Sequence, residues 1–140
     1  MAPVNTAESI AVFVVDDTPS MRDRLRELLD DIDGVEVVGD AGNLDEATAG
    51  ILRTHPDCVL LDYQIEGGTG VDVLRAVCAQ SPDIEFIVLT NHATDQHRRA
   101  CLNAGARFFL DKSSEFGSIR TAIAEIDSRR RRAEPRRTAA

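Results

Sequence analysis

Five short apolar runs alternate along the chain with five longer amphipathic segments. The runs span residues 10–15, 35–40, 58–61, 84–89 and 107–110. The first, third and fourth are almost continuously hydrophobic, which is typical of strands in a parallel sheet that is covered on both faces. Strict alternation of strand and helix predicts an α/β fold of (βα)5 type, with right-handed crossovers placing helices on both faces of the sheet. We therefore expect a doubly wound, open, five-stranded parallel sheet.

The segments between the runs carry helix signals. They span residues 19–32, 44–54, 70–79, 94–105 and 114–130. Asn43 and Thr94 are suitable N-caps, and Gly105 is a suitable stop. Gly67, Gly68 and Gly70 are interpreted as turn residues between the third strand and the helix that follows it.

The length of 140 residues suits one domain and not two. We expect a leader at 1–9, the domain at 10–128 and an Arg-rich tail at 129–140. No apolar run approaches the roughly 20 residues that span a bilayer, and no basic leader precedes the first run. This predicts a cytoplasmic protein without membrane contact. Three isolated cysteines are interpreted as reduced, mostly buried residues rather than disulfides or metal ligands: Cys58, Cys78 and Cys101.

Charge is distributed unevenly. The chain carries a formal net charge of -8, yet residues 129–140 hold six Arg against one Glu, so the body is more acidic than the whole. An acidic body argues against nucleic-acid binding by the folded domain. The tail is either a solvated helix end that frays after Pro135 or a contact for nucleic acid or membrane.

Polar side chains stand where the predicted strands end. Asp16 and Asp17 follow the first strand, Asp62 the third, Thr90 the fourth and Lys112 the fifth. Ligands of open parallel sheets bind at this edge. Three neighbouring carboxylates repel each other unless they are protonated or neutralised, and an all-oxygen donor set suits Mg2+ or Mn2+. We expect Asp17 to bind the metal directly and Asp16 to bind it through water.

The same edge can support phosphoryl chemistry. Beside a bound cation, Asp62 is suited to act as a nucleophile towards a phosphoryl group, while Lys112 and Thr90 can neutralise and hydrogen-bond its oxygens. Taken alone, the Asp16–Asp17 pair could equally serve as a helix N-cap. Together with Asp62 and Lys112, the pair indicates a metal-binding and phosphoryl-transfer site rather than a helix N-cap. The histidines have no spacing partner for zinc: His55, His92 and His97.

Four stretches of the sequence carry a family resemblance. In order and spacing, "FVVDDTPSMRDRLRELL", "CVLLDYQIEGGTGVDVL", "IVLTN" and "NAGARFFLDKS" resemble the receiver domain of two-component response regulators, from residue 10 to about 126. The resemblance implies a flavodoxin-like fold with the strand order 2-1-3-4-5 known from the chemotaxis receiver.

The resemblance also implies roles at the strand ends. Asp62 would accept a phosphoryl group from a histidine kinase or phosphotransfer protein. Asp16, Asp17 and Asp62 would bind Mg2+ together with the backbone carbonyl of Gln64. Lys112 would contact the phosphoryl group.

A conformational switch is implied as well. Thr90 would be the switch hydroxyl, and Phe109 would be the aromatic side chain coupled to it. Phosphorylation would draw Thr90 inward, so that Phe109 turns into the space it leaves. The output surface would be roughly residues 94–127, and this face could also form a homodimer.

The chain departs from the family pattern at several positions. Glu66 and Ser113 stand where many receivers carry proline. Asn91 is bulkier than the small residue that commonly follows the switch hydroxyl in this family. Gln64, Asn91 and His92 border the path of the attacking water, so the lifetime of the phosphoryl group stays open.

These observations predict a single-domain response regulator that is no enzyme beyond its own phosphorylation and dephosphorylation, and that acts on an unknown effector protein. The alternatives are a phosphate sink or a phosphorylation-independent scaffold. A haloacid-dehalogenase-like phosphatase fits less well, because that family carries Asp-x-Asp where this chain has adjacent Asp16 and Asp17.

Overall fold

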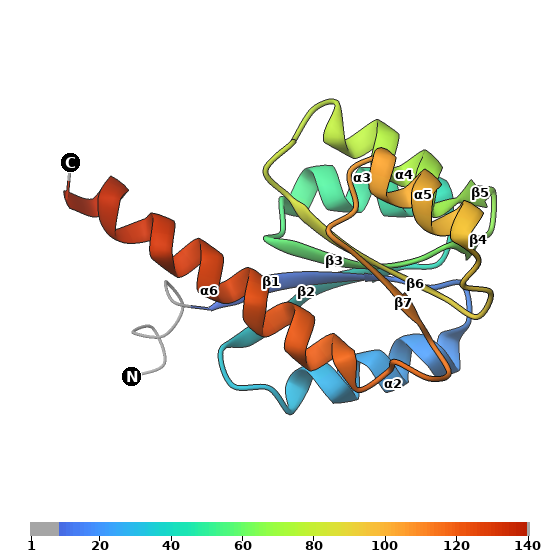
Figure 1. The fold of residues 1–140 in the computed structure, drawn as a ribbon, viewed down its shortest axis with the longest axis horizontal. Coiled ribbons are helices and arrows are strands. Elements are labelled where there is room, and N and C mark those ends of the chain that lie inside the picture. Colours follow the sequence, from blue (N-terminus) through green and yellow to red (C-terminus); the bar gives the residue numbers. More distant parts are fainter. Residues whose placement is uncertain (1–8, 140) are drawn as a thin grey trace.

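The computed structural model describes residues 9–139, with side chains described as far as Arg132. Its main sheet has five parallel strands in the order β2-β1-β3-β6-β7 (Figure 1). The strands are β1 (Ile10–Val15), β2 (Val35–Ala41), β3 (Cys58–Asp62), β6 (Glu85–Thr90) and β7 (Phe108–Asp111). The predicted α/β fold and the strand order implied by the resemblance are both confirmed.

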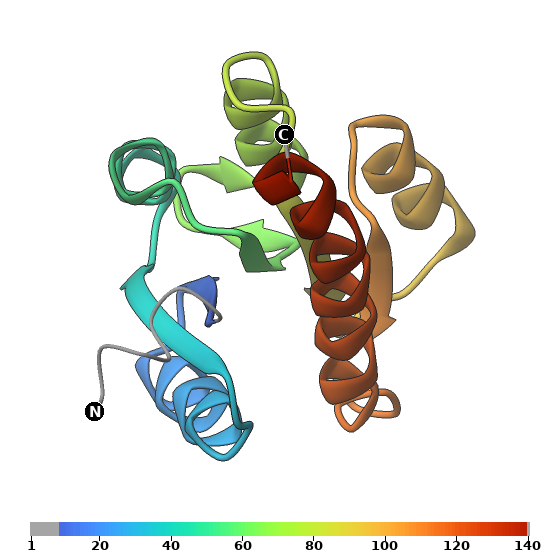
Figure 2. The same cartoon turned by 90° about the vertical axis from the view of Figure 1, so that its left-hand side faces the viewer.

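Helices cover both faces of this sheet. The helices are α2 (Pro19–Asp30), α3 (Leu44–Thr54), α4 (Gly70–Cys78), α5 (Asp95–Asn103) and α6 (Ser118–Ala139). Helices α2 and α6 pack on one face, and α3, α4 and α5 pack on the other (Figures 1 and 2). This doubly wound arrangement leaves the carboxyl ends of the strands free of helices.

Two hydrophobic cores flank the sheet, and the central strands contribute to both. In β3, Val59 and Leu61 belong to the core under α3, α4 and α5, while Cys58 and Leu60 belong to the core under α2 and α6. Every residue of β3 is buried. Because successive side chains of a strand point to opposite faces, a strand covered on both sides must be apolar throughout. This explains the continuous hydrophobic runs.

The predicted caps are present. The side chain of Asn43 accepts a hydrogen bond from the Glu46 amide at 2.8 Å, and Thr94 accepts one from the His97 amide at 3.1 Å. Gly105 adopts a positive φ of 118° just after α5, a conformation that favours glycine. Local capping chemistry thus sets the ends of α3 and α5.

A small antiparallel hairpin was not predicted. It pairs β4 (Gln64–Ile65) with β5 (Gly68–Thr69), directly after the third main strand. Gly67 turns between them with φ of 94°, which agrees with its interpretation as a turn residue. The hairpin carries the chain from Asp62 into α4.

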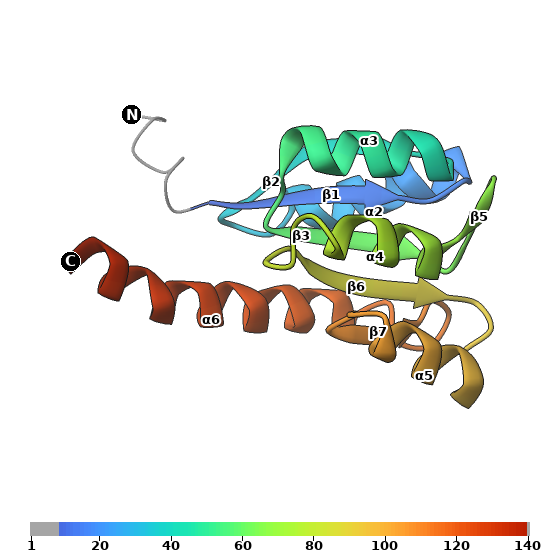
Figure 3. The same cartoon turned by 90° about the horizontal axis from the view of Figure 1, so that it is seen from above.

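The last helix is longer than predicted. It begins at Ser118 and its backbone continues as a helix through Pro135 to Ala139, beyond the predicted end at residue 130. Figure 3 shows α6 running beyond the sheet at the edge away from the strand carboxyl ends. Arg129 pairs with Glu85 at 3.3 Å and Arg130 with Asp57, and these ion pairs hold the helix past residue 128.

The expected domain boundary at 128/129 therefore falls inside a continuous helix, while the leader at 1–9 lies almost wholly outside the described residues. The three cysteines are free, and Cys58 and Cys101 are buried, as predicted. Burial raises the pKa of the Cys101 thiol to about 11. Within residues 9–139, no helix has the length and apolar character that spanning a membrane requires.

Candidate functional site

A small polar pocket lies at the carboxyl ends of the central strands. Its volume is about 160 Å³, and it is lined by Asp17, Thr18, Asp62, Gln64, Thr90, Asn91, His92 and Lys112. Of the residues singled out in the sequence, Asp16 and Phe109 do not line it. Both are buried, at 0% and 3% exposure. The topology thus gathers residues from four loops into one place.

Three carboxylates form the acidic part of the site. Asp16, Asp17 and Asp62 each offer an oxygen, and these oxygens lie within 4.8 Å of one another. Asp17 is exposed, whereas the other two are buried. The donor set contains only oxygen, so its chemistry fits a hard divalent cation such as Mg2+ or Mn2+. The exposed Asp17 is the member best placed for direct binding.

Asp16 is held by four separate hydrogen bonds. Its amide donates to the Ala41 carbonyl at 3.0 Å, and its own carbonyl accepts from Arg22 Nη1 at 2.6 Å. Its Oδ1 accepts from the Thr18 amide at 2.9 Å, and its Oδ2 accepts from Lys112 Nζ at 2.7 Å. Both the backbone and the carboxylate of this residue are therefore fixed.

Lys112 is the only lysine in the chain. Its Nζ lies 2.7 Å from Asp16 Oδ2 and 3.2 Å from Asp62 Oδ2. Burial alone would lower the pKa of Lys112, but the hydrogen bond to Asp16 and the charge of Asp62 outweigh burial and raise it. The side chain is thus a permanent ammonium ion that bridges two buried carboxylates.

Asp62 has a perturbed carboxyl group. Burial raises its pKa from 3.8 to about 6, and the charge of Asp16 also raises it, while Lys112 and the Gln64 amide lower it. The Gln64 amide donates to Asp62 Oδ1 at 3.4 Å. At neutral pH this carboxylate is largely ionised although it is only 8% exposed.

Thr90 and Phe109 lie on neighbouring strands. The register pairs Phe109 with Val88, two residues before Thr90, so all three share one face of the sheet. The Thr90 hydroxyl accepts a hydrogen bond from the His92 amide at 3.0 Å. Phe109 packs into the core, and the guanidinium of Arg98 lies 5.1 Å from its ring centroid.

Two contacts beside the site could not be predicted from the sequence. Arg22 was treated only as part of a helix, yet it binds the Asp16 carbonyl. The ring of Tyr63, the residue after Asp62, stacks on His97 with centroids 4.3 Å apart and planes at 23°. Both contacts join residues of different elements, so neither has a local sequence signal.

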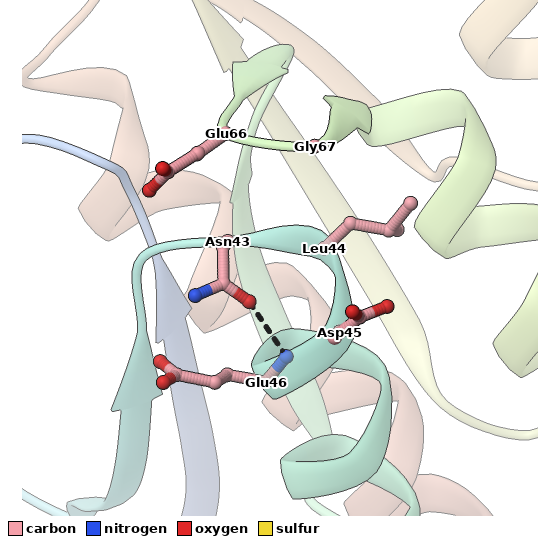
Figure 4. A pocket seen from close by; sticks show the side chains of 6 residues that line it. All are labelled: Asn43, Leu44, Asp45, Glu46, Glu66 and Gly67. Atoms are coloured by element: carbon pink, nitrogen blue, oxygen red, sulfur yellow. Dashed lines mark hydrogen bonds between the residues drawn. The ribbon is translucent and has the colours of Figure 1, made fainter.

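A larger cavity of about 440 Å³ lies elsewhere (Figure 4). It is lined by Asn43, Leu44, Asp45, Glu46, Glu66 and Gly67. The Leu44 amide donates to the Glu66 carbonyl at 2.9 Å, which ties the hairpin to the start of α3. The lining offers carboxylates but no cation and no nucleophile–base pair. The smaller pocket, which contains Asp62, Thr90 and Lys112, is therefore the candidate functional site.

Comparison with known proteins identifies the family. Residues 12–124 match the model of the response regulator receiver domain. The chain therefore belongs to the receiver domains of two-component response regulators, a family whose members bind Mg2+ at an acidic pocket and interact with histidine kinases and partner proteins.

Two curated relatives illustrate the match. The chain is 29% identical over 131 residues to the DNA-binding transcriptional activator DevR/DosR of Mycobacterium tuberculosis, covering 94% of this chain and 60% of that protein. It is 32% identical over 114 residues to the response regulator GacA of Pseudomonas syringae pv. syringae, covering 81% of this chain and 53% of that protein. The chain thus spans little more than half the length of these relatives.

Solved structures agree. A LuxR-family response regulator from Aurantimonas superposes with a TM-score of 0.82 at 27% identity, covering 86% of each chain. The receiver domain of the response regulator NarL from Mycobacterium tuberculosis superposes with a TM-score of 0.80 at 29% identity, covering 86% of this chain and 97% of that one.

Proposed function

We propose that this chain receives a phosphoryl group on Asp62 from the phosphohistidine of a histidine kinase or phosphotransfer protein. The observation that carries the proposal is the bridge from Lys112 Nζ to Asp16 and Asp62, at 2.7 and 3.2 Å, inside a three-carboxylate cluster. An ion pair that served stability alone would not need a third, exposed carboxylate beside it. The cluster instead suits a cation and a phosphoryl group.

In the proposed transfer, an oxygen of Asp62 forms a bond to phosphorus while the P–N bond of the donor breaks, and the donor histidine, whose other ring nitrogen carries a proton, leaves as neutral imidazole. Lys112 remains paired with Asp16 and turns its other protons from Asp62 to a phosphoryl oxygen. The Thr90 hydroxyl donates a hydrogen bond to a second oxygen.

The metal complements these groups. Asp17, Asp62 and the Gln64 carbonyl would hold Mg2+ or Mn2+, with Asp16 acting through water, and the bound cation would supply positive charge beside the phosphoryl oxygens. Gln64, Asn91 and His92 line the same pocket, where water must approach for hydrolysis. In this proposal their side chains set the lifetime of the phosphoryl group.

The signal leaves through Thr90. In the structure, the Thr90 hydroxyl accepts a hydrogen bond from the His92 amide. When the hydroxyl turns towards the phosphoryl group, this bond changes and the loop that leads to α5 shifts. Phe109 is already buried without a phosphoryl group, so in this proposal it packs behind the shifted Thr90 and does not turn in from the surface as the resemblance implied. The changed surface is that of α5, β7 and α6, which binds an effector protein or a second copy of the chain.

The output is protein binding in the cytoplasm, and catalysis is limited to the chain's own phosphorylation and dephosphorylation. DevR/DosR binds DNA, but the body of this chain is acidic, so its folded domain is a poor ligand for nucleic acid. Any DNA-binding output would belong to sequence outside the receiver domain.

Intact-mass measurement after incubation with acetyl phosphate and Mg2+ tests the proposal. We expect a single phosphoryl adduct that is absent with EDTA and absent in Asp62→Asn. The same samples are offered p-nitrophenyl phosphate. Steady turnover of this ester without an adduct would replace the proposal with a phosphatase activity.

A further inference from the structure

We propose that Arg22 is a positioning residue for the metal site: it holds the main chain of Asp16, and through it the neighbouring Asp17, in the geometry that binds a divalent cation. The inference deepens the proposed function and rests on it. Arg22 does not line the pocket, so it acts through the acidic pair and not on the ligand.

Arg22 connects three elements. It lies in the first turn of α2, and its Nη1 donates to the Asp16 carbonyl at 2.6 Å, at the end of β1. Its Nε lies 3.8 Å from Oδ1 of Asp40 in β2. The second oxygen of Asp40 pairs with Arg26 Nη1 at 2.7 Å. Asp40 thus anchors two arginines, of which one reaches the acidic pair.

Gly42 makes room for this contact. A Cβ at position 42 would lie 2.7 Å from Arg22 Nη1, closer than real Cβ atoms approach a neighbour. Its φ lies outside the positive region, so alanine fits the backbone there. The atom it would displace is the far end of a flexible side chain. Alanine at this position would therefore move the guanidinium without altering any charge.

The position of the Asp16 carbonyl matters for Asp17. Among the residues that the structure describes, the Asp17 side chain makes one weak hydrogen bond, in which the Thr18 hydroxyl donates to its Oδ1 at 3.5 Å. Its orientation depends on the peptide between Asp16 and Asp17. The carbonyl of that peptide is the group that Arg22 holds. Partners that orient metal ligands in this way commonly change metal affinity when they are removed.

The charge of Arg22 and its contact with Asp16 predict opposite changes in Mg2+ affinity when Arg22 is replaced. If Arg22 were only a nearby cation, its loss would reduce repulsion of Mg2+ and tighten binding. If it positions the acidic pair, its loss weakens binding. The direction of the change separates the two roles, which a loss of stability alone would not do.

The test is an Mg2+ titration in which the fluorescence of Tyr63 reports metal binding. The chain has one tyrosine and no tryptophan, and this tyrosine directly follows Asp62. We expect Arg22→Gln and Gly42→Ala each to weaken Mg2+ binding about tenfold. Arg26→Gln, which removes the other arginine on Asp40, is the matched control and should leave affinity unchanged or slightly tighter. Thermal unfolding without metal should be similar for Arg22→Gln and Arg26→Gln.

Unchanged or tighter Mg2+ binding in Arg22→Gln would overturn the inference while leaving the proposed function intact. Gly42→Ala keeps the inference testable if Arg22→Gln folds poorly, because it retains every charge. An absence of Mg2+ binding by the unmodified protein would reject the proposed function and, with it, this role of Arg22.

Discussion

Lys112 Nζ donates to Asp16 Oδ2 at 2.7 Å across 96 positions of sequence, and both side chains are buried. This contact joins the end of β1 to the end of β7, two strands separated by β3 and β6 in the sheet. It therefore spans the whole site edge, and the third partner, Asp62, lies between its two ends.

Replacing Lys112 tests the contribution of this bridge to stability. Lys112→Met would leave Asp16 and Asp62 buried without a counter-ion, and we expect a loss of about 3 kcal/mol in the free energy of unfolding at pH 7. Urea denaturation measures this loss. Arg120→Met is the control, since Arg120 pairs with Asp31 on the surface, where such pairs contribute less than about 1 kcal/mol. Equal losses in the two variants would contradict the account.

The raised pKa of Asp62 makes the stability of the metal-free protein depend on pH. The unfolded carboxyl titrates near 3.8 and the folded one near 6, so ionisation opposes folding. The cost is absent below pH 3.8, grows between pH 3.8 and 6, and is complete above 6. At pH 7 in EDTA, Asp62→Asn should be more stable than the unmodified protein by about 2 to 3 kcal/mol.

Thermal unfolding of Asp62→Asn and the unmodified protein from pH 4 to pH 7 measures this difference. The gap should widen as pH rises. A gap that stays constant, or one that is larger at pH 4, would show that the burial of Asp62 carries no such cost.

Asp17 should dominate metal binding. It is the exposed carboxylate of the cluster, so Asp17→Ala should weaken Mg2+ binding at least about tenfold in a fluorescence titration, while the fold is kept. Asp45→Ala is the control, because Asp45 is also acidic but lines the larger cavity. Equal effects of both variants would mean that Mg2+ responds to general negative charge and not to this site.

The stacking of Tyr63 on His97 should be detectable. His97→Ala removes a ring 4.3 Å from Tyr63, and we expect changed tyrosine emission and a loss of about 1 kcal/mol in stability. His55→Ala, which removes an exposed partner of Asp83, should leave the emission unchanged. Identical spectra for His97→Ala and the unmodified protein would mean that the rings do not stack in solution.

Much of the fold could be predicted, because its signals are local. The bounds of β1 and α3 match the predicted ranges, since a continuous apolar run and an Asn43 cap fix them. The site edge could be predicted because parallel strands bring their carboxyl ends together. Asp16, Asp62, Thr90 and Lys112 converge for that reason.

Other features depend on contacts between distant residues. The hairpin of β4 and β5 has two residues in each strand, too few for a periodic signal. The end of α6 lies beyond the predicted residue 130, and the ion pairs of Arg129 with Glu85 and of Arg130 with Asp57 join residues too far apart in the sequence to give a local signal. The role of Arg22 could not be predicted because its partner is a backbone carbonyl, a group that every residue carries and that the sequence therefore does not mark.

The most direct test of the central claim is to locate the phosphoryl group. After incubation with acetyl phosphate and Mg2+, borohydride reduction converts an aspartyl phosphate to homoserine, and peptide mass spectrometry identifies the modified position. The account predicts homoserine at position 62 and at no other aspartate. Reduction at Asp16 or Asp17, or a phosphoryl adduct that yields no homoserine, would contradict the assignment of Asp62 as the acceptor.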